Sequence, residues 1–128
     1  MNYLADTRKT ILYADQHRGI RKITSEMLDK LGYRVIDCKN GSEVIHYYSN
    51  FKHEIDLIFL DLVMPTMDAA ICIQKLKTLN CDLPIVVCSG YQSRRKVLRA
   101  IREGACCFIE KPYGLNKLAW AMHEGLKD

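Results

Sequence analysis

The chain has 128 residues, of which 48% are hydrophobic and 27% are charged. This composition excludes intrinsic disorder, collagen-like repeats and low-complexity sequence, and the length predicts a single domain over 1–128. No apolar run approaches the roughly 18 residues of a membrane span, and the first residues lack the apolar core of a signal peptide. We therefore expect a cytoplasmic protein that does not enter a membrane.

The positive charge is concentrated in one segment. Nineteen basic residues against fifteen acidic ones give a net charge of +4. Five of the basic residues lie within nine positions, and without them the balance is 14 against 15. They are Arg94, Arg95, Lys96, Arg99 and Arg102. One basic face is expected, and not the broad basic surface of a domain that binds nucleic acid directly.

Short apolar runs alternate with longer amphipathic segments along the chain. The runs over 10–14, 33–38, 55–60, 83–88 and 106–109 predict five strands. The segments 18–31, 43–51, 69–79, 93–102 and 115–127 predict helices, the third with Asp68 as its N-cap. In the first helix, the apolar spacing predicts a buried face, and a stop is expected at Gly32. That face comprises Ile20, Ile23, Met27, Leu28 and Leu31.

Strands that alternate with helices predict an α/β fold with a parallel sheet covered on both faces. The strand order 2-1-3-4-5 of a flavodoxin-like, doubly wound (βα)5 fold is one arrangement, and other doubly wound orders remain open. The six cysteines include no C-x-x-C pair, and most lie in apolar stretches. We expect them to be structural thiols and not disulfides or metal ligands.

Polar residues follow the strands at the edge where such sheets carry their sites. Asp15, Gln16 and His17 follow the first strand, Asp61 ends the third, Ser89 ends the fourth, and Lys111 follows the fifth. A carboxylate placed between a hydroxyl and an ammonium suits phosphoryl transfer, in which the carboxylate is the nucleophile. A second carboxylate can hold Mg²⁺.

Four segments at these positions resemble the receiver domains of two-component response regulators. They are ILYADQHRGIR, DLIFLDLVMPTMD, PIVVCSG and GACCFIEKPY, in that order along the chain. The resemblance implies that Asp61 accepts a phosphoryl group from a histidine kinase or a histidine phosphotransfer protein. It further implies Mg²⁺ bound by Asp15, Asp61 and the backbone carbonyl of Val63. Ser89 and Lys111 are then expected to contact the phosphoryl oxygens.

The same resemblance places the switch aromatic at Phe108, assigns Ser89 to the switch as well, and implies a cis Lys111–Pro112 bond. It implies no enzymatic activity beyond the domain's own phosphorylation and dephosphorylation. A phosphatase with an aspartate nucleophile would need a D-x-D motif after the first strand, and a flavin module would need a phosphate-binding loop there. The sequence contains neither.

The sequence departs from the family at Gln16, where these domains usually carry a second acidic residue. Gln16 can contact a metal-bound water through its amide, but it brings no charge. We therefore expect weak Mg²⁺ binding. The alternative function is a degenerate receiver that binds partners without phosphorylation.

A helical wheel places Arg95, Lys96, Arg99 and Arg102 on one side of the fourth helix, with Val97, Leu98 and Ile101 near the other. Cations in the first turn of a helix oppose its dipole, so helix stability does not explain them. Trp120 lies away from the apolar stripe of the last helix. We expect an acidic protein partner, or a second copy of the chain, to bind a face formed by the fourth helix, fifth strand and fifth helix.

Overall fold

The computed structural model describes residues 7–90 and 94–127, and within these ranges five parallel strands form one sheet. Their order, β2-β1-β3-β4-β5, confirms the predicted flavodoxin-like α/β fold. The strands are β1 (Thr10–Ala14), β2 (Arg34–Cys38), β3 (Leu57–Asp61), β4 (Ile85–Ser89) and β5 (Cys107–Glu110).

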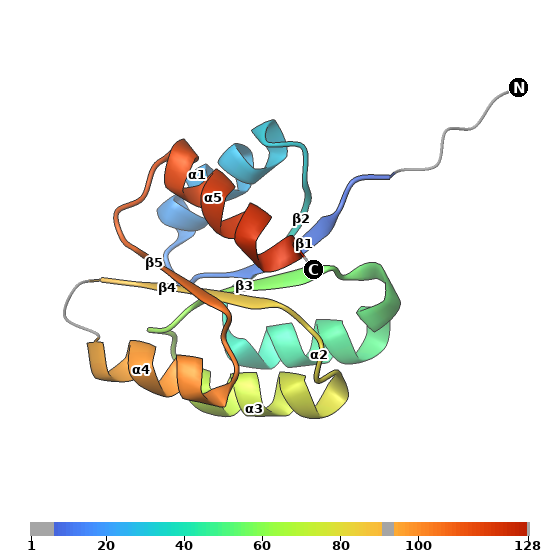
Figure 1. Cartoon of the computed structure of the whole chain (residues 1–128), viewed down its shortest axis with the longest axis vertical. Coiled ribbons are helices and arrows are strands. Elements are labelled where there is room, and N and C mark those ends of the chain that lie inside the picture. Colours follow the sequence, from blue (N-terminus) through green and yellow to red (C-terminus); the bar gives the residue numbers. More distant parts are fainter. Residues whose placement is uncertain (1–6, 91–93, 128) are drawn as a thin grey trace, which may run out of the picture.

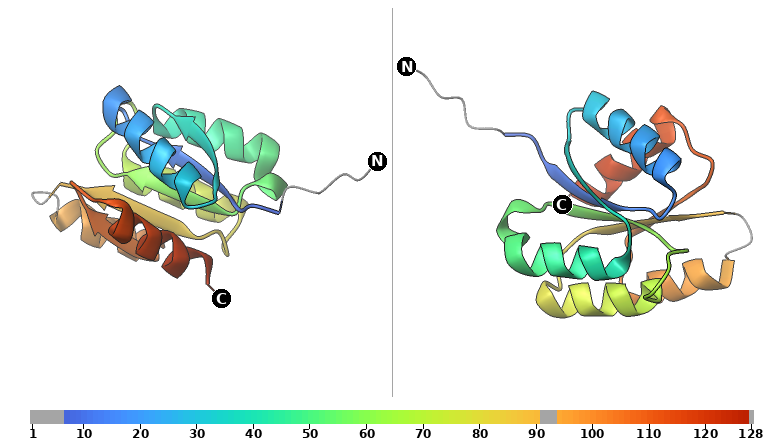
Figure 2. Two further views of the ribbon diagram at one scale, coloured as in Figure 1. Left: turned by 90° about the horizontal axis from the view of Figure 1, so that it is seen from above. Right: turned by 180° about the vertical axis from the view of Figure 1, so that it is seen from behind.

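Helices cover both faces of this sheet. They are α1 (Arg18–Lys30), α2 (Gly41–Phe51), α3 (Ala69–Leu79), α4 (Arg94–Glu103) and α5 (Leu115–Leu126), with a short 3₁₀ turn, η1 (Lys52–Glu54), after α2. Helices α1 and α5 lie on one face, and α2, α3 and α4 lie on the other (Figure 1). The right-hand view of Figure 2, from behind, shows α2, α3 and α4 on the same side of the sheet. Among the described residues, no helix is long and apolar enough to cross a bilayer.

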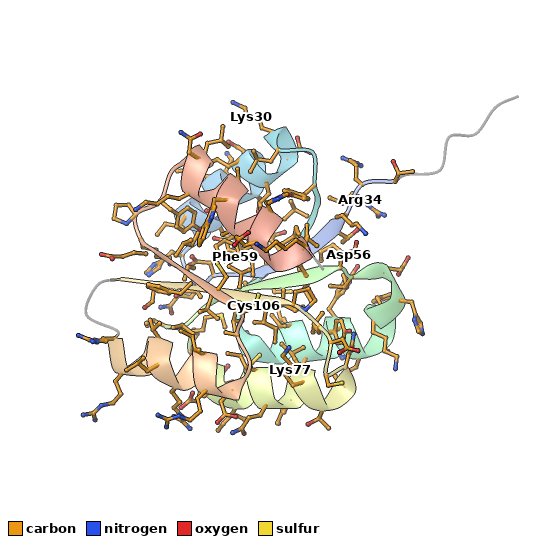
Figure 3. The ribbon with its side chains drawn as sticks, viewed as in Figure 1. Lys30, Arg34, Asp56, Phe59, Lys77 and Cys106 are labelled. Carbon is orange, nitrogen blue, oxygen red and sulfur yellow. The ribbon has the colours of Figure 1, made fainter. Side chains whose placement is uncertain are left out.

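The central strands are buried on both faces because their side chains alternate between two apolar clusters. In β1, Ile11 and Tyr13 pack toward α1 and α5, whereas Leu12 and Ala14 pack toward α2 and α3. In β3, Phe59 lies in the α1/α5 cluster and stacks on Tyr13 with ring centroids 5.2 Å apart (Figure 3). This two-sided burial explains why β1, β3 and β4 have nearly continuous apolar sequences.

The observed boundaries differ from the predicted ones by one or two residues. Helix α2 begins at Gly41, two residues early, because the Asn40 side chain accepts the Glu43 backbone N–H at 2.9 Å. Strand β3 begins at Leu57 and extends to Asp61, so the candidate phosphoacceptor is the last residue of the strand. Helix α1 ends one residue early, and Gly32 follows with a φ of 95°, as a stop requires. Ser93, the predicted first residue of the fourth helix, lies outside the described residues.

The predicted buried face of α1 is wrong at two positions. Ile20 is 38% exposed and Ile23 is 59% exposed, whereas Thr24 and Leu28 are buried. The Thr24 hydroxyl hydrogen-bonds the Tyr113 hydroxyl at 2.9 Å, which lets a polar side chain take a position against the sheet. Apolar periodicity cannot reveal a buried face centred on a threonine, because the hydroxyl's partner is 89 residues away.

All six cysteines are free thiols, which confirms that they form no disulfides. Four of them, Cys38, Cys72, Cys88 and Cys107, are buried as predicted, whereas Cys81 and Cys106 are exposed. Burial raises the pKa of Cys38 and of Cys72 to about 12. Both side chains are therefore neutral thiols at physiological pH and act as small apolar residues.

Helix α5 lies close to the sheet at Gly125. A Cβ atom added there would lie 2.5 Å from Leu57 Cδ1 and 2.9 Å from Val86 Cγ2. Gly125→Ala is expected to lower the free energy of unfolding by about 1–3 kcal/mol, because overpacking outweighs the gain in helix propensity. Gly19 in α1 has no atom within 4 Å of such a Cβ, so Gly19→Ala is the control and leaves stability unchanged or higher. Urea denaturation measures the free energy of unfolding of both variants. Equal values for Gly125→Ala and Gly19→Ala would contradict the expected overpacking.

Candidate functional site

The polar residues predicted at the sheet edge lie together because their strands are neighbours. Asp61 is the last residue of β3 and pairs with Cys88 of β4, and Ser89, the last residue of β4, pairs with Glu110 of β5. Asp15 directly follows β1, and Lys111 directly follows β5. Parallel strands end at the same edge, so four segments distant in sequence deliver two carboxylates, a hydroxyl and an ammonium to one place.

The Lys111 ammonium bridges the two carboxylates. Its Nζ lies 2.8 Å from Asp15 Oδ2 and 2.9 Å from Asp61 Oδ2. The Asp15 side chain is fully buried, that of Asp61 is 3% exposed, and that of Lys111 is 17% exposed. Two negative groups against one positive group leave the cluster with one net negative charge.

Other hydrogen-bond donors also contact the oxygens of these two carboxylates. The His17 backbone N–H donates to Asp15 Oδ1 at 2.8 Å, and the Val63 backbone N–H donates to Asp61 Oδ1 at 3.0 Å. The Tyr13 hydroxyl donates to Asp15 Oδ2 at 3.2 Å. Both carboxylates are thus held in one orientation before any ligand arrives. The sequence analysis missed Tyr13, although its spacing of two residues from Asp15 places both side chains on the same face of an extended chain.

Burial and charge act in opposite directions on these groups. Burial raises the pKa of the Asp61 carboxyl above its usual value, and the hydrogen bond from Lys111 offsets this only in part. Burial alone would lower the pKa of Lys111, but its hydrogen bonds to Asp15 and Asp61 raise it. The lysine therefore stays a cation and supplies a fixed positive charge beside Asp61.

Ser89 carries a hydroxyl that is not engaged by the described part of the chain. The residue is fully buried, and its Oγ has no hydrogen-bond partner within residues 7–90 and 94–127. An unpaired buried hydroxyl is costly, so the Ser89 hydroxyl is a candidate to donate to a ligand at the end of β4. Phe108, the predicted switch aromatic, pairs with Val87 of β4. It is partly buried against the apolar cluster on the face of the sheet that α2, α3 and α4 cover.

The residues at this edge fit a magnesium ion in part. One ammonium nitrogen touches both Asp15 and Asp61, so a single small cation can reach both carboxylates, and Mg²⁺ prefers one or two of these with waters. No cluster of three or more His, Cys, Asp or Glu side chains suited to a metal occurs among the described residues. The third expected donor, the Val63 carbonyl, accepts the Gln16 side-chain amide at 3.2 Å. Gln16 therefore contacts a predicted metal ligand directly.

The basic residues of α4 and Trp120 lie on different layers. Arg95, Lys96 and Arg99 line a hollow together with α3 and the loop before it, and Arg99 Nη1 pairs with Asp68 Oδ2 at 2.9 Å. Trp120 is 53% exposed on α5, in the layer that covers the other face of the sheet (Figure 1). Leu98 is 53% exposed and lies among the arginines, which corrects its predicted place on the opposite side of the helix.

Comparison with known proteins shows the family of this chain. The model of the response regulator receiver domain matches residues 11–123. The chain belongs to the response regulator receiver domain family. It is 29% identical over 117 residues to the chemotaxis protein CheY of Bacillus subtilis, covering 91% of this chain and 96% of that protein. It is 31% identical to the transcriptional regulator NtrC of Azospirillum brasilense, where the match spans 91% of this chain and 24% of the regulator.

Solved receiver domains share the fold. A response regulator receiver domain protein from Clostridium thermocellum has a TM-score of 0.87 at 19% identity, covering 92% of this chain and 94% of that one. A CheY-like receiver domain protein from Methanospirillum hungatei has a TM-score of 0.85 at 25% identity, covering 94% of both chains. The receiver domain is thus shared with both short chemotaxis proteins and longer regulators.

The loop after β3 of this receiver domain contains a strained residue. Thr66 has a φ of 72°, a left-handed conformation that costs a β-branched residue about 1–2 kcal/mol. Thr66→Gly is expected to raise the free energy of unfolding by about 0.5–1 kcal/mol, since relief of strain exceeds the added freedom of the unfolded chain. Thr78→Gly, on exposed α3 backbone of ordinary helical conformation, is the control and should lose about 0.3–0.5 kcal/mol, the difference in helix propensity between threonine and glycine. Thermal or urea unfolding decides it; a destabilised Thr66→Gly would be inconsistent with strain.

Proposed function

We propose that this receiver domain accepts a phosphoryl group on Asp61 from a histidine kinase or a histidine phosphotransfer protein. The observation that carries the proposal is the Lys111 ammonium 2.9 Å from Asp61, beside a buried Ser89 hydroxyl without a partner in the described chain. A purely structural carboxylate needs neither a bridging cation shared with a second carboxylate nor a vacant hydroxyl. Activity toward any substrate other than its own aspartate is not part of the proposal.

The chemistry follows from the fixed charges. An Asp61 carboxylate oxygen forms a bond to phosphorus while the bond from phosphorus to the donor's imidazole nitrogen breaks, and that nitrogen keeps the electron pair. Negative charge is spread over the transferred oxygens, where Lys111 and Ser89 supply a cation and a hydrogen-bond donor. Because the strand ends fix the backbone of both residues before the donor arrives, only their side chains need to move.

Ser89 also gives the domain a route for signalling. A hydroxyl that turns toward a new phosphoryl oxygen changes the packing at the end of β4, next to β5. Phe108 of β5 packs in the same apolar cluster as Val97 and Ala100 of α4. Phosphorylation is therefore proposed to shift Phe108 and alter the face of α4, β5 and α5, where an acidic protein partner or a second copy binds.

Asp15 and Asp61 are proposed to hold Mg²⁺, with the Val63 carbonyl as a third donor and Gln16 adjacent to it. When bound, the ion supplies two positive charges that neutralise carboxylate and phosphoryl oxygens. Gln16 weakens this binding for two reasons: it lacks a charge, and its amide already occupies the Val63 carbonyl at 3.2 Å. A cytoplasmic location accords with a kinase partner and with a nucleotide-linked phosphoryl supply.

The direct test is the intact mass after incubation with a small acyl-phosphate donor, with and without Mg²⁺. A gain of about 80 Da is expected in the presence of the metal, and none in Asp61→Asn, because the nucleophile is removed. Asp29→Asn is the control, since Asp29 is exposed on α1. No gain at saturating donor and metal would overturn the phosphoacceptor role.

A second test addresses Gln16. Gln16→Asp is expected to tighten Mg²⁺ binding by about tenfold or more, because it adds a charge and frees the Val63 carbonyl; one charge pair at about 4 Å amounts to at most roughly 4 kcal/mol. Gln74→Asp, exposed on α3, adds the same charge away from the site. Calorimetric titration with Mg²⁺ measures both. A dissociation constant unchanged in Gln16→Asp would contradict this account of the site.

The second candidate function is a receiver that binds its partner without phosphorylation. Gln16 favours this second function, because its side-chain amide hydrogen-bonds the Val63 carbonyl, a proposed metal ligand, in place of an ion. The two candidates differ in one measurement. Asp61→Asn abolishes regulated partner binding if phosphorylation drives it, and leaves binding unchanged if it does not.

A further inference from the structure

Helix α4 exposes positive charges that the rest of the described chain does not neutralise. Arg99 pairs with Asp68 at 2.9 Å, but its four basic neighbours on α4 have no ion-pair or hydrogen-bond partner within residues 7–90 and 94–127. These neighbours are Arg94, Arg95, Lys96 and Arg102. Three of the five cations fall in the first helical turn, where they oppose the helix dipole. Neither pairing within the described chain nor helix stability accounts for this arrangement.

The basic residues border two adjoining hollows. One, of about 530 Å³, lies between α4 and the loop that leads from β3 into α3. The other, of about 550 Å³, lies along the outer face of α4. Arg95 and Arg99 line both hollows, so the hollows adjoin at these two side chains. We call the two hollows together the α3–α4 groove.

The α3–α4 groove has apolar lining residues, which we call its floor, and cationic ones, which we call its rim; Thr66 and Asp68 line it as well. Its inner end is lined by Leu62, Met64, Met67, Ala69 and Ala70, and its outer end by Leu98. Leu98 is 53% exposed. The first backbone N–H groups of α3 add little to anion binding, because Asp68 Oδ1 already accepts from Ala70 at 2.8 Å. A ligand would therefore meet methionine and leucine side chains together with guanidinium and ammonium groups, and the Asp68 carboxylate that is paired with Arg99.

We propose that the α3–α4 groove binds an acidic segment of a partner protein, with an apolar side chain seated on the methionines and carboxylates paired with Arg95 and Lys96. Free phosphates or a nucleic acid backbone match the rim but leave the apolar floor uncovered. Methionine surfaces adapt to varied apolar side chains, and flanking arginines select acidic sequence around them. The proposal does not depend on phosphorylation of Asp61, and the groove adjoins α3 and not α5.

The probe is a fluorescent helical peptide of about 14 residues with glutamates on one face and leucines beside them, titrated by anisotropy at physiological salt. Arg95→Glu is expected to weaken its binding at least about tenfold. Arg18→Glu changes the charge equally on α1 and is expected to weaken binding less than about twofold. Near-ultraviolet circular dichroism confirms that both variants are folded. Equal weakening by both variants would overturn the proposal, since attraction would then follow net charge.

The apolar floor is tested with the same peptide after every leucine is replaced by serine. Binding is expected to fall about fivefold or more, and Leu98→Ser in the protein reproduces part of that loss. Ile23→Ser, on the exposed face of α1, is the matched control. Displacement of the leucine peptide by tripolyphosphate or duplex DNA at equal charge, or equal affinity for the serine peptide, would overturn the proposal. Unchanged peptide binding by Asp61→Asn supports it and separates it from the phosphoacceptor role.

Discussion

The Lys111 ammonium, held between the carboxylates of Asp15 and Asp61, is the interaction on which the site depends. Its Nζ lies within 2.9 Å of an oxygen from each. Two buried carboxylates so close to one point repel each other strongly, and removing the shared cation would leave charges whose isolation costs on the order of 3–5 kcal/mol. The same cation that makes the pair tolerable inside the protein also faces the position where a phosphoryl group would be transferred. Stability and chemistry therefore share one contact.

This contact requires the doubly wound sheet. β1 and β3 are neighbours in the sheet and β5 lies at its edge, so the carboxyl ends of three strands from distant parts of the chain meet. Apolar side chains that alternate toward α1 and α5 on one face, and toward α2 and α3 on the other, bury β1, β3 and β4 completely. That burial holds the backbone, and the polar groups of the site lie at the strand ends.

The phosphoacceptor edge and helix α4 differ in how many of their polar groups have a hydrogen-bond or ion-pair partner. At the phosphoacceptor edge, backbone N–H groups, Lys111 and the Gln16 amide engage the carboxylates and the Val63 carbonyl, and within the described chain only Ser89 is left without a partner in this group. Along α4, most cations lack partners in the described chain, and they surround an apolar floor. The first region holds its carboxylates and the Lys111 ammonium in fixed positions. The second matches a larger acidic surface.

The sequence by itself determined the fold class and the positions of Asp15, Asp61, Ser89 and Lys111 at strand ends, whereas the tertiary structure decided the strand order among the doubly wound arrangements. The fold class and these positions follow from local patterns, since apolar runs, turn residues and motif spacing are short-range properties of a chain. Only the tertiary structure decided which groups touch: the Tyr13 hydroxyl on Asp15, the Gln16 amide on the Val63 carbonyl, and the position of Leu98 among the arginines. Such contacts depend on how helices rotate against a sheet and how loops approach each other. Hydrophobic periodicity likewise does not predict the buried face of α1 centred on Thr24. The hydrogen-bond partner of Thr24, Tyr113, comes from the far end of the chain.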